Sequence, residues 1–454
     1  MINASSGRRV SVVRSFPGRR HVATVLLFVL ANITGTGLHR VASAAECALI
    51  TDSLERAQPS VAKPGYLQSF KDPLYGTVVT RITGDPGTPI PTIGGVWGNK
   101  ARHNYSKDAV WNADQSLMVL KQVDGISGVL FLDGNTYKPL FSRVGPGGEV
   151  RWHPSIADAM VYLTYACEFG HWNVRTNVRT PLLTPAGYSD CYMGPWEGNT
   201  SSDGSKVAAY ARRVSDGRLV AFVVDLGQRI KYSDLDLASV GVTSTDWVSV
   251  SASGRYLVVN GTITGCRTVS GYCDATKNFT LQGAPVGPFW SEYGQPSHYD
   301  LTINTFGEDV AVGVSKSAPT EGKVIMRRLV DGQVTPLTVG GYAGHTSTRS
   351  ARAGWAYVSH PYNGPYWPPF RNETFAVKLD GSLAIERLGN VHTTNTGDMP
   401  TATPSPDGRR AIFASNWLSD TGPIQAYVLD ARPLCTALPP PPPNVHIVST
   451  LSGG

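Results

Sequence analysis

The sequence predicts an all-β fold, a seven-bladed β-propeller built from four-stranded antiparallel blades. The composition, a recurring strand–turn–strand unit and the two ends of the repeat region lead to this prediction. The chain of 454 residues contains 48 Gly and 32 Pro, and only 16% of its residues are charged. Such usage is typical of many short strands joined by turns, and it argues against a coiled coil or a disordered chain.

The clearest copy of the unit is the segment 401–417, TATPSPDGRRAIFASNW. In its turn, Pro406 presets φ, Asp407 can bond its own backbone, and Gly408 tolerates a positive φ. The apolar residues Ala411 and Phe413 alternate after the turn. The segment therefore predicts a β-hairpin.

Six weaker copies lie upstream, at 110–120, 151–163, 199–210, 248–259, 301–313 and 347–359. The first apolar residue after the turn recurs every 43 to 56 positions, and a further strand and turn lie between copies. Two hairpins in a period of this length are typical of a propeller blade. Seven copies therefore predict seven blades.

The two ends of the repeat region can complement each other. The last copy lacks a fourth strand, whereas residues 76–84, GTVVTRITG, form an unassigned strand before the first copy. Pairing them would remove the free edges of the sheet array. We expect the ring to be closed by this N-terminal strand; an open array of β-sandwiches is the alternative.

Residues 1–45 have the features of a signal peptide. Two arginines precede an apolar run at 22–38, and small residues at 42–45 provide a cleavage region. A membrane anchor or a buried strand is the alternative, but Asn and Gly interrupt the run. We expect a secreted or periplasmic protein whose propeller spans 46–435, followed by a proline-rich tail at 436–454.

Removal of the signal peptide would make the chain neutral. Residues 1–45 hold six Arg and no acid, so 34 of the 40 basic residues remain beside 34 acidic ones. A neutral chain has no global field to attract nucleic acid or an anionic membrane. We therefore expect no nucleic-acid partner. We also expect no membrane span after signal-peptide cleavage, and a monomer.

Six cysteines follow the signal peptide, an even number that an oxidising compartment would pair. A metal cluster is the alternative, but no Cys-x-x-Cys spacing supports it. The two pairs that are local in sequence leave one pair across the ends of the repeat region. The predicted disulfides are Cys266–Cys273, Cys167–Cys191 and Cys47–Cys435.

In a propeller, the inner strands begin around the axis at one face, so residues just before each turn should converge there. Five of the ten histidines fall at such positions. The candidate catalytic residues are His103, Tyr105, Arg151, His153, Tyr299 and Arg349. The candidate substrate-binding residues are Arg102, Trp196 and Trp247. Structural roles are the alternative: the histidines could bond neighbouring blades, and the tryptophans could pack between them.

At Gln295-Pro-Ser-His298-Tyr-Asp300 the sequence resembles the metal-binding stretch of the oligogalacturonate lyases, which are seven-bladed propellers. In that family a Gln-x-x-His-x-His run and a His of the preceding blade hold manganese. The resemblance implies that Gln295, His298 and Asp300 bind Mn or another divalent metal, with His345 of the next blade completing the set. The preceding blade offers Asp246 where the family has His.

The lyase resemblance implies β-elimination on an acidic, uronate-containing glycan. A cation neutralises the carboxylate, a base with a pKa near 7 removes the adjacent proton, and an acid protonates the leaving oxygen. The residues available for these roles are Arg102, Arg151 or Arg349 as cation, His103 or His298 as base, and Tyr105 or Tyr299 as acid.

The Ser-Pro-Asp-Gly repeat also resembles the TolB-like propellers, and the architecture resembles the ulvan lyases. The ulvan lyases are thought to use His, Tyr and Arg without a catalytic metal. A TolB-like resemblance implies the second possible function, a non-catalytic propeller that binds a glycan, a peptide or a partner protein.

Overall fold

The structure is a computed structural model that describes residues 47–194, 197–268, 273–291, 296–340, 344–349, 352–360, 369–394 and 400–435. The chain divides into two compact units, 1–44 and 45–454, and all described residues belong to the second. The expected signal peptide and the proline-rich tail lie outside the described residues.

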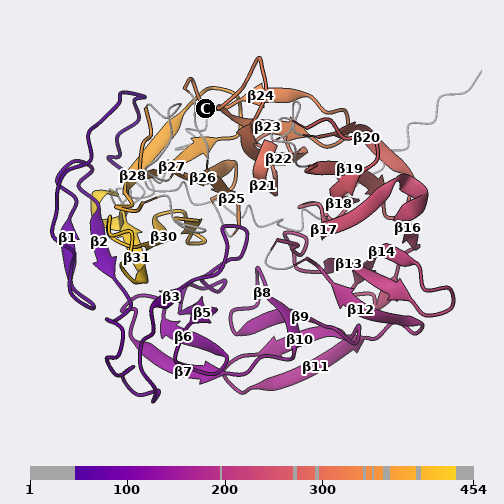
Figure 1. The fold of residues 1–454 in the computed structure, drawn as a ribbon, viewed down its shortest axis with the longest axis horizontal. Coiled ribbons are helices and arrows are strands. Elements are labelled where there is room, and N and C mark those ends of the chain that lie inside the picture. The colour runs from indigo at the N-terminus through magenta and orange to yellow at the C-terminus, as the bar shows by residue number, and fades with distance from the viewer. Residues whose placement is uncertain are drawn as a thin grey trace, which may run out of the picture. The chain divides into compact units, whose positions relative to one another are not determined.

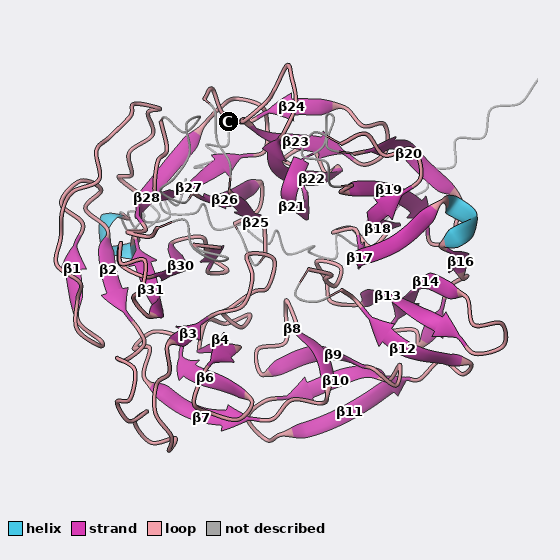
Figure 2. Ribbon diagram, viewed as in Figure 1, coloured by secondary structure: helices cyan, strands magenta, loops and turns pink. Residues whose placement is uncertain are grey.

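The second unit is an all-β propeller in which antiparallel sheets follow one another around a centre (Figures 1 and 2). Three consecutive sheets come from residues 148–290. The first contains β8 (Gly148–Trp152), β9 (Ala159–Thr164), β10 (Phe169–Asn173) and β11 (Val178–Leu183). The second contains β12 (Tyr188–Tyr192), β13 (Lys206–Arg213), β14 (Leu219–Asp225), β15 (Ile230–Lys231) and β16 (Leu235–Asp236). The third contains β17 (Val242–Val250), β18 (Tyr256–Ile263), β19 (Ala275–Thr280) and β20 (Pro285–Trp290).

Two further four-stranded sheets continue the ring. One contains β21 (Pro296–Ile303), β22 (Asp309–Ser315), β23 (Val324–Arg328) and β24 (Val334–Pro336). The other contains β25 (His345–Ser347), β26 (Trp355–Ser359), β27 (Glu373–Lys378) and β28 (Ile385–Asn390). Two short 3₁₀ helices, Ala238–Val240 and Arg432–Leu434, interrupt the loops.

The two ends of the described chain share one sheet. It joins β29 (Thr403–Pro404), β30 (Arg410–Ser415) and β31 (Ile424–Asp430) with β2 (Val78–Arg81), β1 (Ser69–Lys71), β3 (Lys100–Arg102) and β5 (Gln122–Val123). Strand β2 runs antiparallel to β31, with Val78 opposite Asp430 and Arg81 opposite Tyr427. That this pairing is what closes the ring remains a prediction.

The prediction of seven blades is wrong: in the part of the chain that the structure describes, six sheets have four or more strands, and the first copy does not form such a sheet. The first copy forms a three-stranded sheet of β4 (Leu117–Leu120), β6 (Val129–Asp133) and β7 (Pro139–Arg143). Its inner edge is reduced to a bridge between Trp111 and Met118. The preceding residues turn instead of extending, because Asp108 N donates to Tyr105 O at 3.0 Å.

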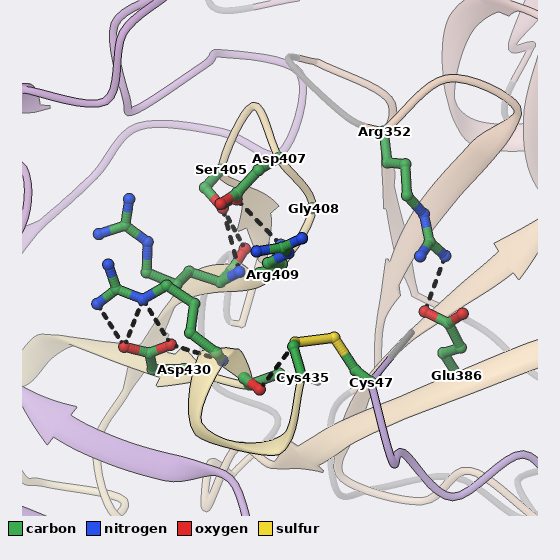
Figure 3. The surroundings of a disulfide bond; sticks show 12 residues. Cys47, Arg352, Glu386, Ser405, Asp407, Gly408, Arg409, Asp430 and Cys435 are labelled. Atoms are coloured by element: carbon green, nitrogen blue, oxygen red, sulfur yellow. Dashed lines mark hydrogen bonds and ion pairs between the residues drawn. A yellow bond between two sulfur atoms is a disulfide. The ribbon is translucent and has the colours of Figure 1, made fainter. Parts of the chain in front are cut away.

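The predicted hairpin at 401–417 is confirmed by the pairing of β29 with β30. Asp407 Oδ1 accepts from Ser405 Oγ at 2.6 Å and from Arg409 N at 3.1 Å (Figure 3). Gly408 has φ 69°, in the left-handed region that glycine occupies without strain. The hydrogen bonds of Asp407 and the positive φ of Gly408, both predicted from the sequence, therefore form this turn.

All three predicted disulfides are present: Cys47–Cys435, Cys167–Cys191 and Cys266–Cys273. Figure 3 shows Cys47–Cys435, which joins the two ends of the described chain. Apolar clusters fill the spaces between neighbouring sheets; one packs Phe131 against Trp152 and Trp172. Within the described ranges, no helix has the length and hydropathy needed to cross a membrane.

Candidate functional site

Two matching β-bulges shape the site. In β17 the register slips between Thr245 and Trp247, so Asp246 is an extra residue. In β21 it slips between Ser297 and Asp300, so His298 and Tyr299 together oppose Gly313. A side chain at Gly313 would crowd the bulge, because its Cβ would lie 2.5 Å from Ser297 O. A bulge re-aims the residue that it inserts.

In both bulges an exposed polar residue precedes a buried aromatic one. Asp246 and His298 are exposed, whereas Trp247 and Tyr299 are 3% and 2% exposed. The two aromatic rings pack together at 5.2 Å. His298 has φ 45°, which costs a non-glycine residue on the order of 1–3 kcal/mol. The fold holds His298 in this conformation through the bulge.

The ring of His298 lies against two other predicted site residues. Its Nδ1 is 3.2 Å from the hydroxyl of Tyr105. Its ring centroid is 4.7 Å from that of His345, and the Tyr105 ring meets His345 edge-on at 5.1 Å. Tyr105, His298 and His345 therefore form one contact group, which we call the axial cluster. Tyr105 lies in the loop after β3, His298 lies in β21, and His345 begins β25.

A lysine that the sequence analysis missed lies beside the axial cluster. Lys107 is 2% exposed, and its ammonium group lies over the rings of Trp247 at 4.4 Å and Tyr299 at 5.2 Å. It also forms an ion pair with Glu197. Lys107 stands two positions after Tyr105, in the same pre-turn stretch that supplied other candidates. This position before the turn was the only feature of the sequence that could have marked Lys107 as a site residue. Its neighbours in the chain do not indicate that its ammonium group is buried.

The electrostatic surroundings keep His298 neutral. Although His298 keeps accessible surface, neighbouring protein atoms desolvate its ring, and this desolvation lowers its pKa. The positive charges of Lys316 and Lys107 act in the same direction. Burial also lowers the pKa of His345 well below its usual value, and raises that of Tyr299 well above. Two neutral imidazoles therefore stand side by side at neutral pH.

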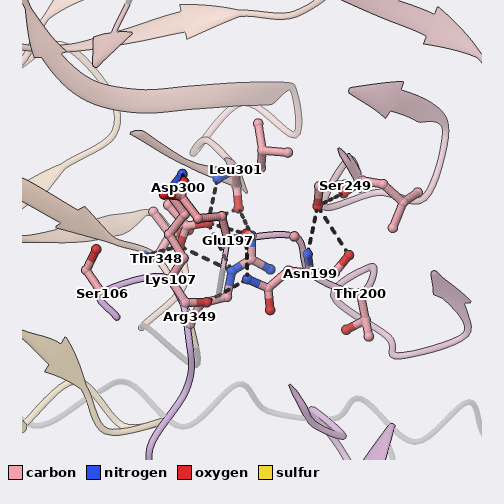
Figure 4. Close-up of polar contacts among 12 residues, drawn as sticks. Ser106, Lys107, Glu197, Asn199, Thr200, Ser249, Asp300, Leu301, Thr348 and Arg349 are labelled. Carbon is pink, nitrogen blue, oxygen red and sulfur yellow. Dashed lines mark hydrogen bonds and ion pairs between the residues drawn. The ribbon is translucent and has the colours of Figure 1, made fainter. Parts of the chain in front are cut away.

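Asp300 and Arg349 form a separate, buried ion pair. Arg349 Nη2 donates to Asp300 Oδ1 at 2.7 Å, and Thr348 N and Oγ1 both donate to Asp300 Oδ2 at 2.9 Å (Figure 4). Arg349 also lines a cavity of about 420 Å³ together with Arg151. The pair ties β21 to the loop after β25.

Three other predicted site residues, Arg102, His103 and Arg151, have structural partners. Arg102 is 1% exposed and donates to His103 O at 3.1 Å and Asn104 O at 2.9 Å. His103 Nε2 lies 2.7 Å from Thr401 O, and burial lowers the pKa of His103 to about 3. Arg151 donates to Gly198 O at 2.9 Å and to Glu149 at 3.1 Å.

His153 belongs to a different contact. Its ring meets that of His171 at 5.1 Å, and its Nδ1 accepts from Ser155 N at 3.2 Å. Burial lowers the pKa of His153 to about 4. Two other candidates, Trp196 and Gln295, lie outside the described residues. Of the predicted site, the described structure brings together Tyr105, His298 and His345, with Trp247 and Tyr299 behind them.

The described residues do not fit the manganese set implied by the resemblance. Among them, no three His, Cys, Asp or Glu side chains gather as metal ligands. Asp300 is engaged by Arg349 and Thr348. His298 and His345 alone lack the carboxylate oxygens that manganese prefers. Gln295, the remaining member of the predicted set, lies outside the described residues.

No protein-family model and no curated protein matches the sequence. The structure is similar to an oligogalacturonate lyase in complex with manganese, with a TM-score of 0.53 and 15% identity over 80% of this chain and 95% of that chain. It is also similar to an oligogalacturonate lyase from Vibrio parahaemolyticus, with a TM-score of 0.52 and 12% identity over 80% of this chain and 96% of that one.

A TolB from Acinetobacter baumannii aligns with a TM-score of 0.35 and 11% identity, over 67% of this chain and 77% of that chain. That similarity is too low to support an argument. The similarity to the two lyases shows the fold: the chain is a β-propeller of antiparallel blades. The function has to be argued from the site.

Proposed function

We propose that this chain is a secreted enzyme of the polysaccharide-lyase type, which cleaves an acidic glycan by β-elimination at the axial cluster. The observation that carries the proposal is the contact of the Tyr105 hydroxyl with His298 Nδ1 at 3.2 Å, beside His345. An acid and a base this close can act on adjacent atoms of one substrate. The shared architecture with two propellers named oligogalacturonate lyase supports it at the level of fold.

The chemistry depends on which nitrogen of His298 carries the proton. With the proton on Nδ1, that nitrogen donates to Tyr105 and leaves the Nε2 lone pair free. Nε2 then removes the proton next to the uronate carboxylate. The hydroxyl proton of Tyr105 remains available for the leaving glycosidic oxygen. The lowered pKa of His298 keeps the base in its neutral form at pH 7.

The cation that neutralises the substrate carboxylate differs from the three arginines of the sequence hypothesis. The buried guanidinium groups of Arg102 and Arg151 donate hydrogen bonds to backbone carbonyl oxygens, and Arg349 forms an ion pair with Asp300. Lys316 lies in the loop after β22, and its positive charge lowers the pKa of His298. We propose Lys316 for the neutralising role because its charge acts on His298, the proposed base. Lys107 is buried against aromatic rings.

The test is an elimination assay on the mature protein. Polygalacturonate, ulvan and glucuronan are incubated with and without manganese, and the ultraviolet absorbance of the unsaturated uronate is followed. Tyr105→Phe and His298→Asn should each lower the rate by about 100-fold or more. His171→Asn, which lies outside the axial cluster, should keep the rate. Absence of product on all three glycans would rule out the proposal.

A non-catalytic glycan-binding propeller is the second candidate. The observation that favours it is that Asp300, expected among the metal ligands, is already engaged by Arg349 and Thr348. Binding of an acidic glycan without an unsaturated product, measured by calorimetry on the same samples, would select this function.

A further inference from the structure

A second cavity lies along the inner strands, beyond the axial cluster. Its volume is about 420 Å³. Three of its lining residues each stand four positions after a member of the axial cluster, and these are Ala109, Thr302 and Arg349. Along the extended strand β21, four residues span on the order of 10 Å. We call this space the distal cavity, because its residues Thr302 and Ile303 end β21, whereas His298 stands near the start of that strand.

Residues between the two sites are already engaged in polar contacts. Asp300 accepts hydrogen bonds from Arg349 and from Thr348 (Figure 4). Asn199 Nδ2 donates to Lys107 O at 2.5 Å. The distal cavity is therefore a separate space and not an extension of the axial cluster.

The charged side chains that line the distal cavity are all basic. They are Arg151, Arg349 and Arg352, and among the described residues no Asp or Glu lines it. Each of the three guanidinium groups forms an ion pair with a carboxylate that lies outside the lining. The cavity is thus bordered by the cationic member of each pair. Because the Coulomb energy falls with distance, the net effect on a ligand in the cavity favours negative charge.

Two of the three arginines keep hydrogen-bond donors that their ion pairs do not use. Arg349 bonds Asp300 through Nε and Nη2, and Arg352 bonds Glu386 through Nη2 at 2.8 Å. Within the described ranges, Nη1 of both arginines has no hydrogen-bond partner, and their side chains are 12% and 23% exposed. A guanidinium group presents five N–H donors in a planar fork, so it can hold one carboxylate and bind a second oxyanion. In Arg151, by contrast, all three nitrogens are bonded.

The guanidinium group of Arg352 is also held in place. Its Cζ lies 4.0 Å from the centroid of the Trp355 ring, and Glu386 holds one of its edges. A side chain that is already ordered loses little conformational entropy when it binds a ligand. Arg352 is therefore a preorganised donor.

Two hydroxyl groups add polar atoms to the distal cavity. Ser202, in the turn before β13, and Thr302, in β21, both line it. Neither hydroxyl has a hydrogen-bond partner in the part of the chain that the structure describes. The acidic residues of the neighbouring turns, Asp203 and Asp407, accept hydrogen bonds from residues of their own turns. The two hydroxyl groups are therefore available to a ligand.

The distal cavity is larger than a single inorganic anion requires. A water molecule occupies about 30 Å³ in the liquid, so a cavity of about 420 Å³ has room for an anionic group and for a body attached to it. This volume is within the range of small-molecule sites. Apolar side chains that such a body would contact are those of Pro154, Ile303 and Pro406.

We propose that the distal cavity is an oxyanion site whose ligand is a small organic acid. Nη1 of Arg349 and Nη1 of Arg352 donate to the acid group, and the hydroxyls of Ser202 and Thr302 bond the rest of the molecule. The site is distinct from the axial cluster, so it does not depend on the proposed elimination. A free inorganic anion offers the arginines the same chemistry, and the experiment separates the two sources.

Calorimetric titration of the mature protein tests the distal cavity. Galacturonate is the organic acid, galactose is the neutral sugar in which a hydroxymethyl group replaces the carboxylate, and inorganic sulfate is the free anion. We expect galacturonate to bind about tenfold or more tightly than galactose, because hydrogen bonds to a charged group are the stronger ones. Sulfate should bind more weakly than galacturonate. Sulfate that bound as tightly would overturn the organic acid as the ligand, because the body of the molecule would then contribute nothing.

Arg352→Gln should weaken the binding of galacturonate by about tenfold, since it removes one of the two cationic donors. Arg213→Gln is the matched control, because Arg213 is 28% exposed and forms ion pairs on another sheet. His298→Asn changes the axial cluster and should bind galacturonate as the unaltered protein does. This variant separates binding in the distal cavity from binding at the axial cluster.

Thermal unfolding of each variant shows whether it is folded. Should Arg352→Gln unfold, Thr302→Val decides, with an expected loss of about threefold in affinity for galacturonate. Equal binding of galactose and galacturonate, no binding of galacturonate, or unchanged binding by folded Arg352→Gln would overturn the site. So would a loss of binding in His298→Asn. Failure of the elimination assay would remove the proposed function and leave this binding result standing.

Discussion

The hydroxyl of Tyr105 and Nδ1 of His298 lie 3.2 Å apart although 193 positions separate them in the chain. The contact exists because two sheets on different sides of the repeat region present residues to the same axis (Figure 1).

The first prediction concerns the pH profile of elimination. Because the pKa of His298 lies below its ordinary value of 6.5, the neutral base persists below that pH, and the rate should fall only on further acidification. Lys316→Ala removes a positive charge that lowers this pKa, so the acid limb should move to higher pH. Lys323→Ala, which removes a second lysine between β22 and β23, is the control. An acid limb that Lys316→Ala leaves in place would contradict the assignment.

The second prediction concerns the disulfides. In the chain-entropy model, a loop of 388 positions closed by Cys47–Cys435 stabilises the fold by about 6 kcal/mol, and the 7-position loop of Cys266–Cys273 by about 2 kcal/mol. Replacing each pair by Ser and measuring urea unfolding should reproduce this order. A larger loss for the Cys266–Cys273 pair would show that the long loop is held by other contacts.

The third prediction concerns Arg387 and Glu373, whose side chains are both fully buried. Arg387 Nε donates to Glu373 at 2.9 Å, and Nη1 donates to Leu54 O at 2.6 Å. Arg387→Met should lower the free energy of unfolding by about 3–5 kcal/mol, because it leaves a buried carboxylate unpaired. The double variant Arg387→Met/Glu373→Leu should recover a large part of that loss. Equal losses in the single and double variants would place the effect in the lost Leu54 contact.

The fourth prediction concerns acid unfolding. Burial lowers the pKa of His103 to about 3, whereas the unfolded chain binds that proton near pH 6.5. Stability is therefore complete above pH 6.5 and is lost as the pH falls below it. At pH 5 the contribution of His103 is a loss of about 2 kcal/mol. His103→Gln should reduce the difference in unfolding free energy between pH 7.5 and pH 5 by about this amount, and an unchanged difference would exclude His103 as the source.

Local chemistry explains what the sequence could predict. The turn at Ser405–Gly408 uses bonds between neighbours, so its composition predicts its shape. Cysteine pairing followed from spacing and elimination. The strand periodicity located the sheets. The predicted inner strand of the first copy does not form, because Lys107 and Asp108 form ion pairs with Glu197 and Lys121 there.

The site was less predictable because its geometry depends on cross-strand partners. The bulge at His298 requires Gly313 opposite, and it gives His298 and Asp300 different surroundings despite their spacing of two. The partner of Asp300 is Arg349, which lies 49 positions later in the chain. His298 and His345 lie in contact, as their equivalent positions predicted, and their functional role stays a prediction. The same pattern could not show that His103 and His153 contact structural partners.

The bond between Cys47 and Cys435 gives the described chain the connectivity of a covalent loop. A protease that cuts once at an exposed turn, such as the one at Val214, which is 65% exposed, would open the loop without releasing a fragment. The two pieces would migrate as one species until a reductant was added. In a protease-rich medium, a single cut would therefore leave the two fragments covalently linked, and their strands could remain hydrogen-bonded in the same fold.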